Sequence, residues 1–368
     1  MKILHLLSGG EIGGIEILCR DIAALGSDRH EFCFLYHGGC IAEEMKQCGV
    51  PVHFLHEQGI LKRIYGLIRL VKREKYDVVI VHHEGIGIYS LYLILMYLFR
   101  KKKFIKYLHC AFDKRYFEQE SKIKNRLNYL TLSQTLKHSD KIVAVSQFVK
   151  NSYCTQFKCE ENKVSVIYNG IKIPHNHNNE TIPQKKPSGE SIRLLFIGRM
   201  VEGKGIQTLL YAMKKLVAMN ECFELELLGE GPKRAEYEEL AKNLEIGNRV
   251  HFYGQQLEKQ SFYCQTDIFV YPSVVQEAFG LSIVEAMAAG KLCVASRTGG
   301  IPEIIQDEKE GLLFTAGDVD SLAAAVKKAA VICRSEEYDK IVMAARKKSE
   351  NFSIESMLDK LQRLCRME

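Results

Sequence analysis

Two glutamates eight residues apart, Glu277 and Glu285, frame a Phe-Gly-Leu turn at the start of an apolar segment. From residue 281 to residue 289 every residue except Glu285 is apolar or small, which predicts a short buried helix. A buried carboxylate is unfavourable unless it is paired or hydrogen-bonded, so Glu285 requires a partner. At the turn, the first backbone N–H groups of the helix lack intrahelical acceptors and favour an anion. This stretch therefore predicts a site for a phosphorylated, hydroxyl-rich ligand.

Two cations occupy a second turn, between a predicted strand at Ile192–Ile197 and the helix that follows it. Arg199 comes directly after Gly198, and Lys204 precedes Gly205, which opens the helix. Arginine offers a planar fork of donors and lysine a point charge, a combination that suits a diphosphate. For this turn taken alone, a pair of ordinary solvated charges is the alternative interpretation.

A glycine-rich loop at residues 9–14 links the predicted first strand to a helix with apolar residues at helical spacing. Gly13 and Gly14 would let the backbone approach a ligand closely. The spacing differs from the dinucleotide pattern G-x-G-x-x-G, so a dinucleotide site is not indicated. A turn that only packs a helix onto a sheet remains the alternative.

Three histidines, His82, His83 and His109, stand at the C-terminal ends of predicted strands. In an open parallel α/β sheet, ligands bind at this edge. A structural role is the alternative for each single histidine, whereas three at one edge favour a functional role for at least one.

Strands alternate with helical patterns along the chain, which predicts an α/β protein with parallel sheets. The polar segment 173–190 contains three prolines and no apolar periodicity, which is typical of a linker. We therefore expect a first domain at 1–172 and a second at 191–351. An amphipathic helix at 352–368 is expected to cross back to the first domain.

The overall composition is that of an ordinary soluble globular protein, with 46% hydrophobic and 26% charged residues. The net charge of +6 favours anionic substrates or surfaces, but no nucleic-acid partner is indicated. Twelve cysteines without a C-x-x-C pair predict free thiols in a reducing cytoplasm. Neither a signal peptide nor a membrane-spanning segment is predicted.

Two further segments each allow two interpretations. The basic residues 100–103 follow an apolar run at 86–99, which fits either peripheral contact with an anionic inner membrane face or the cationic end of a core helix. Asp318 and Asp320 have a D-x-D spacing that could hold a metal, but their place before an Ala-rich helix favours a helix cap. We expect no metal.

Taken in order, these segments resemble the family-4 glycosyltransferases of the GT-B fold, in which two Rossmann-like domains face each other across a cleft. The resemblance covers nearly the whole chain. The residues that carry it are Gly13, Gly14, Asn169, Gly170, Gly198, Arg199, Lys204, Glu277, Phe279, Gly280, Leu281, Glu285 and the segment Gly299–Glu303.

The resemblance implies a retaining enzyme of the hexosyltransferase type (EC 2.4). Such an enzyme moves one sugar from a UDP- or GDP-sugar to a glycan or lipid-linked acceptor, here in bacterial surface polysaccharide biosynthesis. No cofactor or metal is implied. Two alternatives stay open: a GT-B sugar-nucleotide epimerase, and a non-catalytic nucleotide-sugar-binding protein.

The resemblance also assigns roles to residues of both domains. Arg199 and Lys204 would hold the diphosphate and stabilise its developing charge, while Glu277 would bind the sugar and Glu285 the ribose. His109 would act near the anomeric carbon. The remaining donor-binding residues implied are Gly13, Gly14, Gly198, Gly254, Phe279, Gly280 and Leu281.

One residue departs from the family pattern. Lys172 stands after Asn169-Gly170-Ile171, where the family usually has an acid. The departure concerns the contacts near the domain boundary and leaves the predicted donor residues unaffected.

Overall fold

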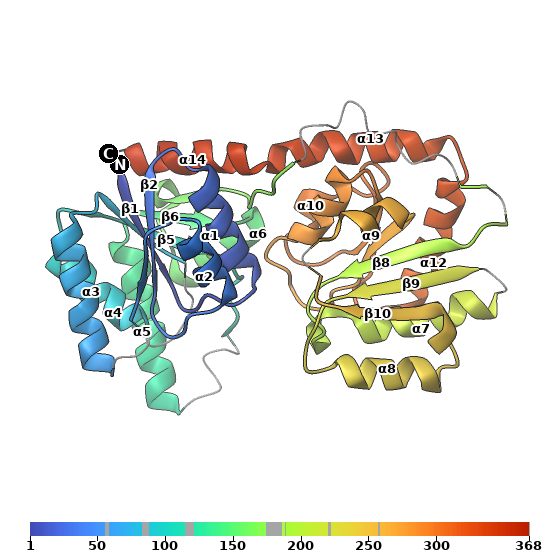
Figure 1. The fold of residues 1–368 in the computed structure, drawn as a ribbon, viewed down its shortest axis with the longest axis horizontal. Coiled ribbons are helices and arrows are strands. Elements are labelled where there is room, and N and C mark those ends of the chain that lie inside the picture. Colours follow the sequence, from blue (N-terminus) through green and yellow to red (C-terminus); the bar gives the residue numbers. More distant parts are fainter. Residues whose placement is uncertain are drawn as a thin grey trace. The chain divides into compact units, whose positions relative to one another are not determined.

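The structure is a computed structural model that describes residues 1–55, 59–82, 88–114, 121–173, 186–187, 189–219, 222–256 and 258–367. The chain forms two compact units, each built on a parallel sheet (Figure 1). The first unit comprises Met1–Lys172 and Ile354–Glu368, and the second comprises Ile173–Ser353. Most of the segment predicted as a linker, 173–190, lies outside the described residues.

Within the residues that the structure describes, the sheet of the first unit has seven strands in the order β3-β2-β1-β4-β5-β6-β7, and all their pairings are parallel. Short apolar strands such as β4 are buried along their whole length, as expected for a parallel sheet covered on both faces. The strands are β1 Lys2–Leu7, β2 Arg29–Phe34, β3 Val52–Phe54, β4 Val78–Val81, β5 Lys103–Leu108, β6 Lys141–Ala144 and β7 Val164–Val166.

Helices of the first unit cover both faces of its sheet. Leu4 and Leu6 of β1 pack into one apolar cluster with Leu67 of α3 and Leu95 of α4, so these two helices share one face (Figure 1). Because side chains alternate along a strand, His5 points to the opposite face. The helices are α1 Gly14–Leu25, α2 Cys40–Gln47, α3 Ile60–Glu74, α4 Ile88–Leu98, α5 Lys122–His138, α6 Gln147–Phe157 and α14 Ile354–Arg366, with a 3-10 turn at Glu161–Lys163.

The C-terminal helix α14 belongs to the first unit, as the sequence predicts. Its apolar stripe, which includes Met357, Leu361 and Leu364, is buried. The backbone N–H of Ile354 donates to the carbonyl of Ile171 at 2.8 Å, and the side chain of Gln362 donates to Ser27 Oγ at the same distance.

The described part of the second unit repeats the architecture with six strands in the order β10-β9-β8-β11-β12-β13, again all parallel. The strands are β8 Ile192–Ile197, β9 Phe223–Leu228, β10 Val250–Gly254, β11 Ile268–Tyr271, β12 Leu292–Ser296 and β13 Leu312–Phe314. The helices are α7 Ile206–Ala218, α8 Arg234–Asn243, α9 Gln260–Gln265, α10 Leu281–Ala288, α11 Ile301–Ile304, α12 Val319–Cys333 and α13 Glu337–Ser349, with 3-10 turns at Glu202–Lys204, Gly247–Arg249 and Glu350–Phe352.

The Asp-x-Asp segment caps a helix, as predicted. Oδ1 of Asp318 accepts from the backbone N–H groups of Asp320 at 2.9 Å and Ser321 at 3.0 Å, which satisfies two donors at the start of α12. The Asp320 carboxylate pairs with Lys215 rather than with its neighbour. The two acids therefore have separate structural partners.

The apolar run that precedes the basic stretch becomes α4, an 11-residue helix. Within the described residues, none of the helices has both the length and the apolar character that crossing a membrane requires.

Candidate functional site

Loops that follow the strands of the second sheet meet at one edge, because parallel strands all end on the same side. Gly198, Arg199 and Lys204 follow β8, Gly254 ends β10, and Glu277 lies in the loop between β11 and α10. The predicted site residues of this unit therefore share the carboxyl edge, where an open α/β sheet binds its ligands.

Glycines let these loops approach one another more closely than any other residue could. A Cβ on Gly205 would lie 1.8 Å from the Pro272 carbonyl oxygen, and its φ of +71° also favours glycine. A Cβ on Gly299 would lie 2.1 Å from the Glu277 carbonyl oxygen, to which the N–H of Gly300 donates at 2.7 Å. The loop that carries Glu277 is thus held from two sides.

Lys204 and Glu277 form the centre of this edge. Lys204 Nζ lies 2.7 Å from Glu277 Oε1 and donates to the Tyr271 hydroxyl at 3.0 Å. The Ser273 hydroxyl donates to the same Glu277 oxygen at 2.6 Å. The side chains of Lys204 and Glu277 are 22% and 13% exposed, so the pair is largely buried yet reachable from solvent.

Electrostatics fix the charge states of Lys204 and Tyr271. Burial alone would lower the pKa of Lys204, but the neighbouring Tyr271 and Glu277 outweigh it and raise the pKa above its ordinary value. Burial and the Glu277 charge raise the pKa of Tyr271 to about 12. Lys204 is therefore a fixed cation and Tyr271 a neutral hydroxyl near neutral pH.

Glu285 has a partner, as its place in an apolar helix requires, but it is less buried than predicted. Its Oε2 accepts from Lys259 Nζ at 2.9 Å and from the Tyr263 hydroxyl at 3.1 Å. The side chain is 28% exposed because Leu281, Ser282 and Glu285 line the one face of α10 that the core leaves uncovered. A carboxylate on this face can reach a ligand.

The turn between the glutamates ends at Gly280, the N-cap of α10, whose φ of +147° is a conformation for glycine. Phe279 is buried and packs edge-on against Phe352 with ring centroids 5.4 Å apart. Leu281 starts the helix, so its N–H is among the first backbone donors of α10. The helix therefore starts where the sequence predicts, and anion binding by its first N–H groups stays a prediction.

Two further predicted positions of this unit, Arg199 and Gly254, differ in exposure. Arg199 is exposed, whereas Gly254 is buried at the end of β10 with a φ of +71°. The Gly254 carbonyl accepts from the N–H of Gly229 at 2.7 Å, which joins the loops after β9 and β10. Among the cations singled out from the sequence, Arg199 is the more accessible and Lys204 the more constrained.

The first unit carries the remaining predicted residues at the carboxyl edge of its own sheet. Gly13 is the N-cap of α1 and Gly14 its first residue. His109 directly follows β5, is 7% exposed, and lies 2.9 Å from His82, Nε2 to Nδ1. His83 lies outside the described residues.

The sequence did not predict a role for four residues of the candidate site in the second unit: Tyr271, Ser273, Lys259 and Tyr263. Tyr271 is the last residue of β11, so its position at a strand end was a usable signal. Lys259 and Tyr263 are four residues apart and share a helix face, but nothing in the sequence ties them to Glu285.

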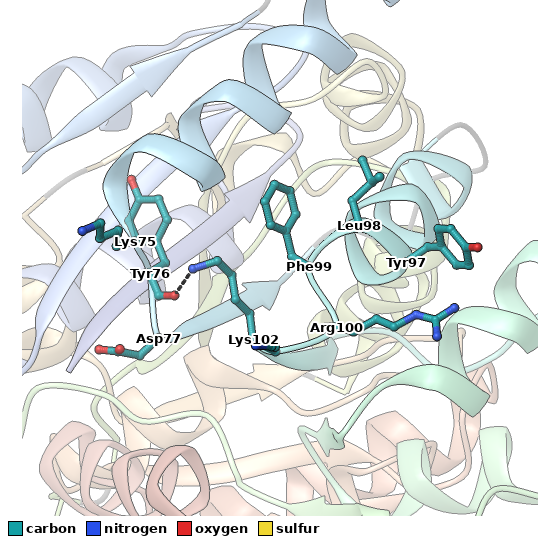
Figure 2. Close-up of a pocket in the computed structure, with 9 residues that line it drawn as sticks. Lys75, Tyr76, Asp77, Tyr97, Leu98, Phe99, Arg100 and Lys102 are labelled. Atoms are coloured by element: carbon teal, nitrogen blue, oxygen red, sulfur yellow. Dashed lines mark hydrogen bonds between the residues drawn. The ribbon is translucent and has the colours of Figure 1, made fainter.

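A cavity of about 660 Å³ lies at the opposite, amino edge of the first sheet. Its lining comes from the residues just before β4 and just before β5, and Lys102 Nζ crosses it to donate to the Tyr76 carbonyl at 2.6 Å (Figure 2). Lys103 donates to the carbonyl of Leu364 at 3.1 Å. Two residues of the basic stretch 100–103 therefore bind backbone carbonyls. The cavity lies at the amino edge of the first sheet, away from the carboxyl edge where ligands are expected to bind.

In the comparison with known proteins, each half of the chain matches a family model of glycosyltransferases. Residues 178–348 match the family model described as Glycosyl transferases group 1, and residues 12–173 match that of Glycosyltransferase Family 4. The chain is 29% identical over 340 residues to an uncharacterised glycosyltransferase of Methanocaldococcus jannaschii, across 85% of this chain and 84% of that protein.

Two further proteins are similar. N-acetyl-alpha-D-glucosaminyl L-malate synthase of Bacillus anthracis is 29% identical over 261 residues, across 70% of this chain and 66% of that enzyme. The crystal structure of Anabaena HepE in complex with UDP matches with a TM-score of 0.82 at 22% identity, over 99% of each chain. The α/β fold with two Rossmann-like domains of the GT-B class, predicted from the sequence, is thereby confirmed.

Proposed function

Because the chain belongs to glycosyltransferase family 4, we propose that it transfers one sugar, with retention, from a UDP- or GDP-sugar to a glycan or lipid-linked acceptor. The observation that carries this proposal is the carboxyl edge of the second sheet, where Lys204 and Glu277 lie in loops that follow strands and Glu285 lies on the uncovered face of α10. HepE, whose structure was determined with UDP and with UDP-glucose, has the same fold. A role in bacterial surface polysaccharide biosynthesis is part of the proposal.

In the proposed mechanism, fixed positive charges on the protein assist the departure of the diphosphate, in place of a general acid that would protonate it. Arg199 and Lys204 stabilise the negative charge that develops on the departing diphosphate, the kind of preorganised electrostatic effect that dominates many enzymes. The N–H groups of Phe279, Gly280 and Leu281 add donors beside it. No metal and no cofactor take part in this proposal.

The two glutamates divide the hydroxyl groups of the donor. Glu277, already 2.7 Å from Lys204, accepts from hydroxyl groups of the sugar, and Glu285 accepts from the ribose in place of part of its present pairing with Lys259. Gly198 and Gly254 leave room for the phosphates and the base. The roles of Gly13, Gly14 and His109, which belong to the first unit, stay predictions from the resemblance.

The acceptor side of the proposal includes peripheral contact with an anionic membrane. Leu61, Tyr65, Arg69 and Lys72 follow one another at spacings of four, four and three along α3, and all are exposed, Leu61 at 78% and Tyr65 at 67%. Two apolar side chains in line with two cations form one face that suits the headgroup region, each cation adding about 1 kcal/mol near anionic lipid.

The membrane proposal is tested by co-sedimentation with phosphatidylglycerol vesicles at low salt. The double variant Leu61→Glu with Tyr65→Glu should lose binding, whereas Met343→Glu, at another exposed apolar position in the second unit, should keep it. Equal binding by the two variants, or none by the unaltered protein, would contradict the proposal.

The enzymatic proposal is tested by incubating the protein with a panel of UDP-, GDP- and ADP-sugars and measuring nucleoside diphosphate release. Arg199→Ala, at the carboxyl end of β8, is compared with Arg193→Ala near the amino end of the same strand. The first should lose activity by about a hundredfold or more and the second should keep it. An isomeric nucleotide sugar formed without acceptor would indicate that the protein is an epimerase and not a transferase. Tight donor binding with no turnover would indicate a non-catalytic binding protein.

A further inference from the structure

Four histidines of the first unit form a continuous hydrogen-bonded chain. His30 Nδ1 lies 2.9 Å from His5 Nε2, His5 Nδ1 lies 2.8 Å from His82 Nε2, and His82 Nδ1 lies 2.9 Å from His109 Nε2. The residues come from four neighbouring strands or strand ends, β2, β1, β4 and β5. Each link joins two imidazole nitrogens at ordinary hydrogen-bond distance.

The chain runs from solvent to the carboxyl edge of the sheet. His30 is partly exposed and pairs with Ile3 near the start of β1 and β2. His5, His82 and His109 are 0%, 1% and 7% exposed, and His109 follows the last residue of β5. One end of the chain therefore meets water and the other meets the edge where ligands bind.

All four imidazoles are neutral at pH 7, because burial lowers the pKa of each. The pKa of His109 falls to about 3 through burial and the nearby Lys106. The pKa of His82 is lowered by burial, His109 and Lys106, and that of His5 by burial, His82 and His30. For His30, burial lowers the pKa to about 4, with Asp28 and the amino terminus as the charged groups beside it.

A neutral imidazole has one N–H and one bare nitrogen, so the links constrain one another. If His82 donates to His109, its other nitrogen must accept from His5, which in turn must accept from His30. If His109 donates to His82, every link is reversed. A mixed arrangement places two N–H groups or two lone pairs face to face in the interior, and a buried hydrogen bond is lost.

We propose that His30, His5, His82 and His109 form a proton relay that sets the tautomer of His109 and exchanges its proton with solvent at His30. His5, His30 and His82 are thus positioning residues that act through His109. The relay itself is independent of the reaction, whereas its use in sugar transfer rests on the proposed function.

The proton balance of the relay is simple. Starting with His109 donating, a proton bound at its Nδ1 is matched by transfer of its Nε2 proton to His82. His82 passes a proton from Nε2 to His5, His5 passes one from Nε2 to His30, and His30 releases one to water. One proton enters and one leaves, all four imidazoles end neutral, and every tautomer is reversed.

A metal site is the competing interpretation of part of this cluster. One ligand atom from each of His5, His82 and Cys19 can be chosen so that all lie within 4.8 Å of one another. Tetrahedral zinc with Zn–N bonds of about 2.05 Å holds its nitrogen ligands about 3.3 Å apart, whereas Nδ1 of His5 and Nε2 of His82 lie 2.8 Å apart, at hydrogen-bond distance. Burial also raises the pKa of the Cys19 thiol, which favours the protonated form.

The relay is tested by NMR of the full-length protein labelled with ¹⁵N at histidine. Imidazole nitrogen shifts report each tautomer, and N–N couplings report each link. His5, His82 and His109 should each show one tautomer, all in the same direction, with measurable couplings. Mixed tautomers in the unaltered protein would overturn the proposal.

Two variants and one control separate a relay from simple packing. His30→Phe, at the partly exposed end, and His5→Phe, whose ring would retain the stacking on Phe32, should each change the tautomer populations of His109 without touching it. Cys19→Ala should leave them unchanged. If His5→Phe fails to fold, His30→Phe decides alone.

Further outcomes keep the proposal distinct from the proposed function. Unchanged His109 signals in the histidine variants, or one equivalent of zinc that Cys19→Ala removes, would overturn the relay. Once a donor is turned over, His30→Phe should lower kcat by about tenfold and change its pH profile while KM for the donor stays constant. If the protein turned over no donor, the proposed function would fail but the NMR result would still support the relay. If the tautomers of the four histidines proved independent of one another, the relay would fail but the proposed donor site of the second unit would be unaffected.

Discussion

Replacing Lys204 by methionine tests whether Lys204 and Glu277 act as one unit in the absence of any ligand. Methionine retains most of the apolar stem and removes the ammonium. Glu277 then keeps the Ser273 hydroxyl as a donor but loses its cation at 2.7 Å. The variant should therefore unfold more easily than the unaltered protein.

The size of the effect follows from the exposure of the pair. Removing one partner of a fully buried ion pair costs about 3 to 5 kcal/mol, and an exposed pair contributes about 0 to 1 kcal/mol. With side chains 22% and 13% exposed, Lys204 and Glu277 lie between these limits, and we expect a loss of about 2 kcal/mol. For a unit of this size that lowers the melting temperature by about 4 to 8 °C.

The second variant of the cycle supplies the sharper readout. Glu277→Gln removes the charge that Lys204→Met leaves uncompensated, so the double variant should recover part of the lost stability. Calorimetric melts of the four proteins without ligand should give a coupling energy of about 1 to 2 kcal/mol. Additive effects, within about 0.5 kcal/mol, would refute the interpretation of the pair as a coupled unit.

Three other changes have definite expected outcomes. Gly205→Ala would place a Cβ 1.8 Å from a backbone carbonyl oxygen and should cost more than about 2 kcal/mol in urea unfolding, whereas Gly247→Ala, whose Cβ would have no neighbour nearer than 3.7 Å, should be nearly neutral. Lys172→Glu would set a second acid against Asp21, 2.7 Å from the present ammonium, and should cost about 1 kcal/mol more than Lys172→Met in the same assay. Burial lowers the pKa of His30 from 6.5 to about 4, so the unfolded state binds the extra proton as the pH falls below 6.5; stability should decline by about 1.4 kcal/mol at pH 5.5 for this residue, and His30→Phe should remove that share of the pH dependence.

Much of the backbone structure at the candidate site of the second unit follows from local sequence. The apolar run after Gly280 specifies a short helix, and the glycine at its start specifies the turn, so α10 forms where predicted. The same logic places Lys204 and Gly205 at the start of α7. These elements are predictable because each depends on its own residues and their immediate neighbours.

Partners that come from distant segments were not predictable. Lys259 meets Glu285 only because α9 packs on β8 and α10 packs on β11 and β12, the next strands in the sheet, and no spacing in the sequence expresses that contact. Glu285 was expected to be buried, yet it lies on the uncovered face of its helix. Whether one face of so short a helix stays open depends on the surrounding fold.

The histidine chain shows the same limit in the first unit. His82 and His109 were predicted as candidates because they stand at strand ends, but His5 and His30 lie within strands, where neither the apolar neighbours of His5 nor the charged neighbours of His30 indicate a role. Strand order brings the four side chains together, since β2, β1, β4 and β5 lie side by side in the sheet, although β2 and β3 separate β1 from β4 in the sequence.

The proposed function requires the carboxyl edge of the second sheet to bind a nucleotide sugar. Titration calorimetry of UDP, GDP and their sugars into the unaltered protein and Glu285→Ala tests it most directly. We predict that nucleotides of one base, uracil or guanine, bind the unaltered protein. Glu285→Ala should weaken that binding by about tenfold or more through loss of the ribose contact. Equal affinity of both proteins for every nucleotide tested, or no binding by either, would contradict the account.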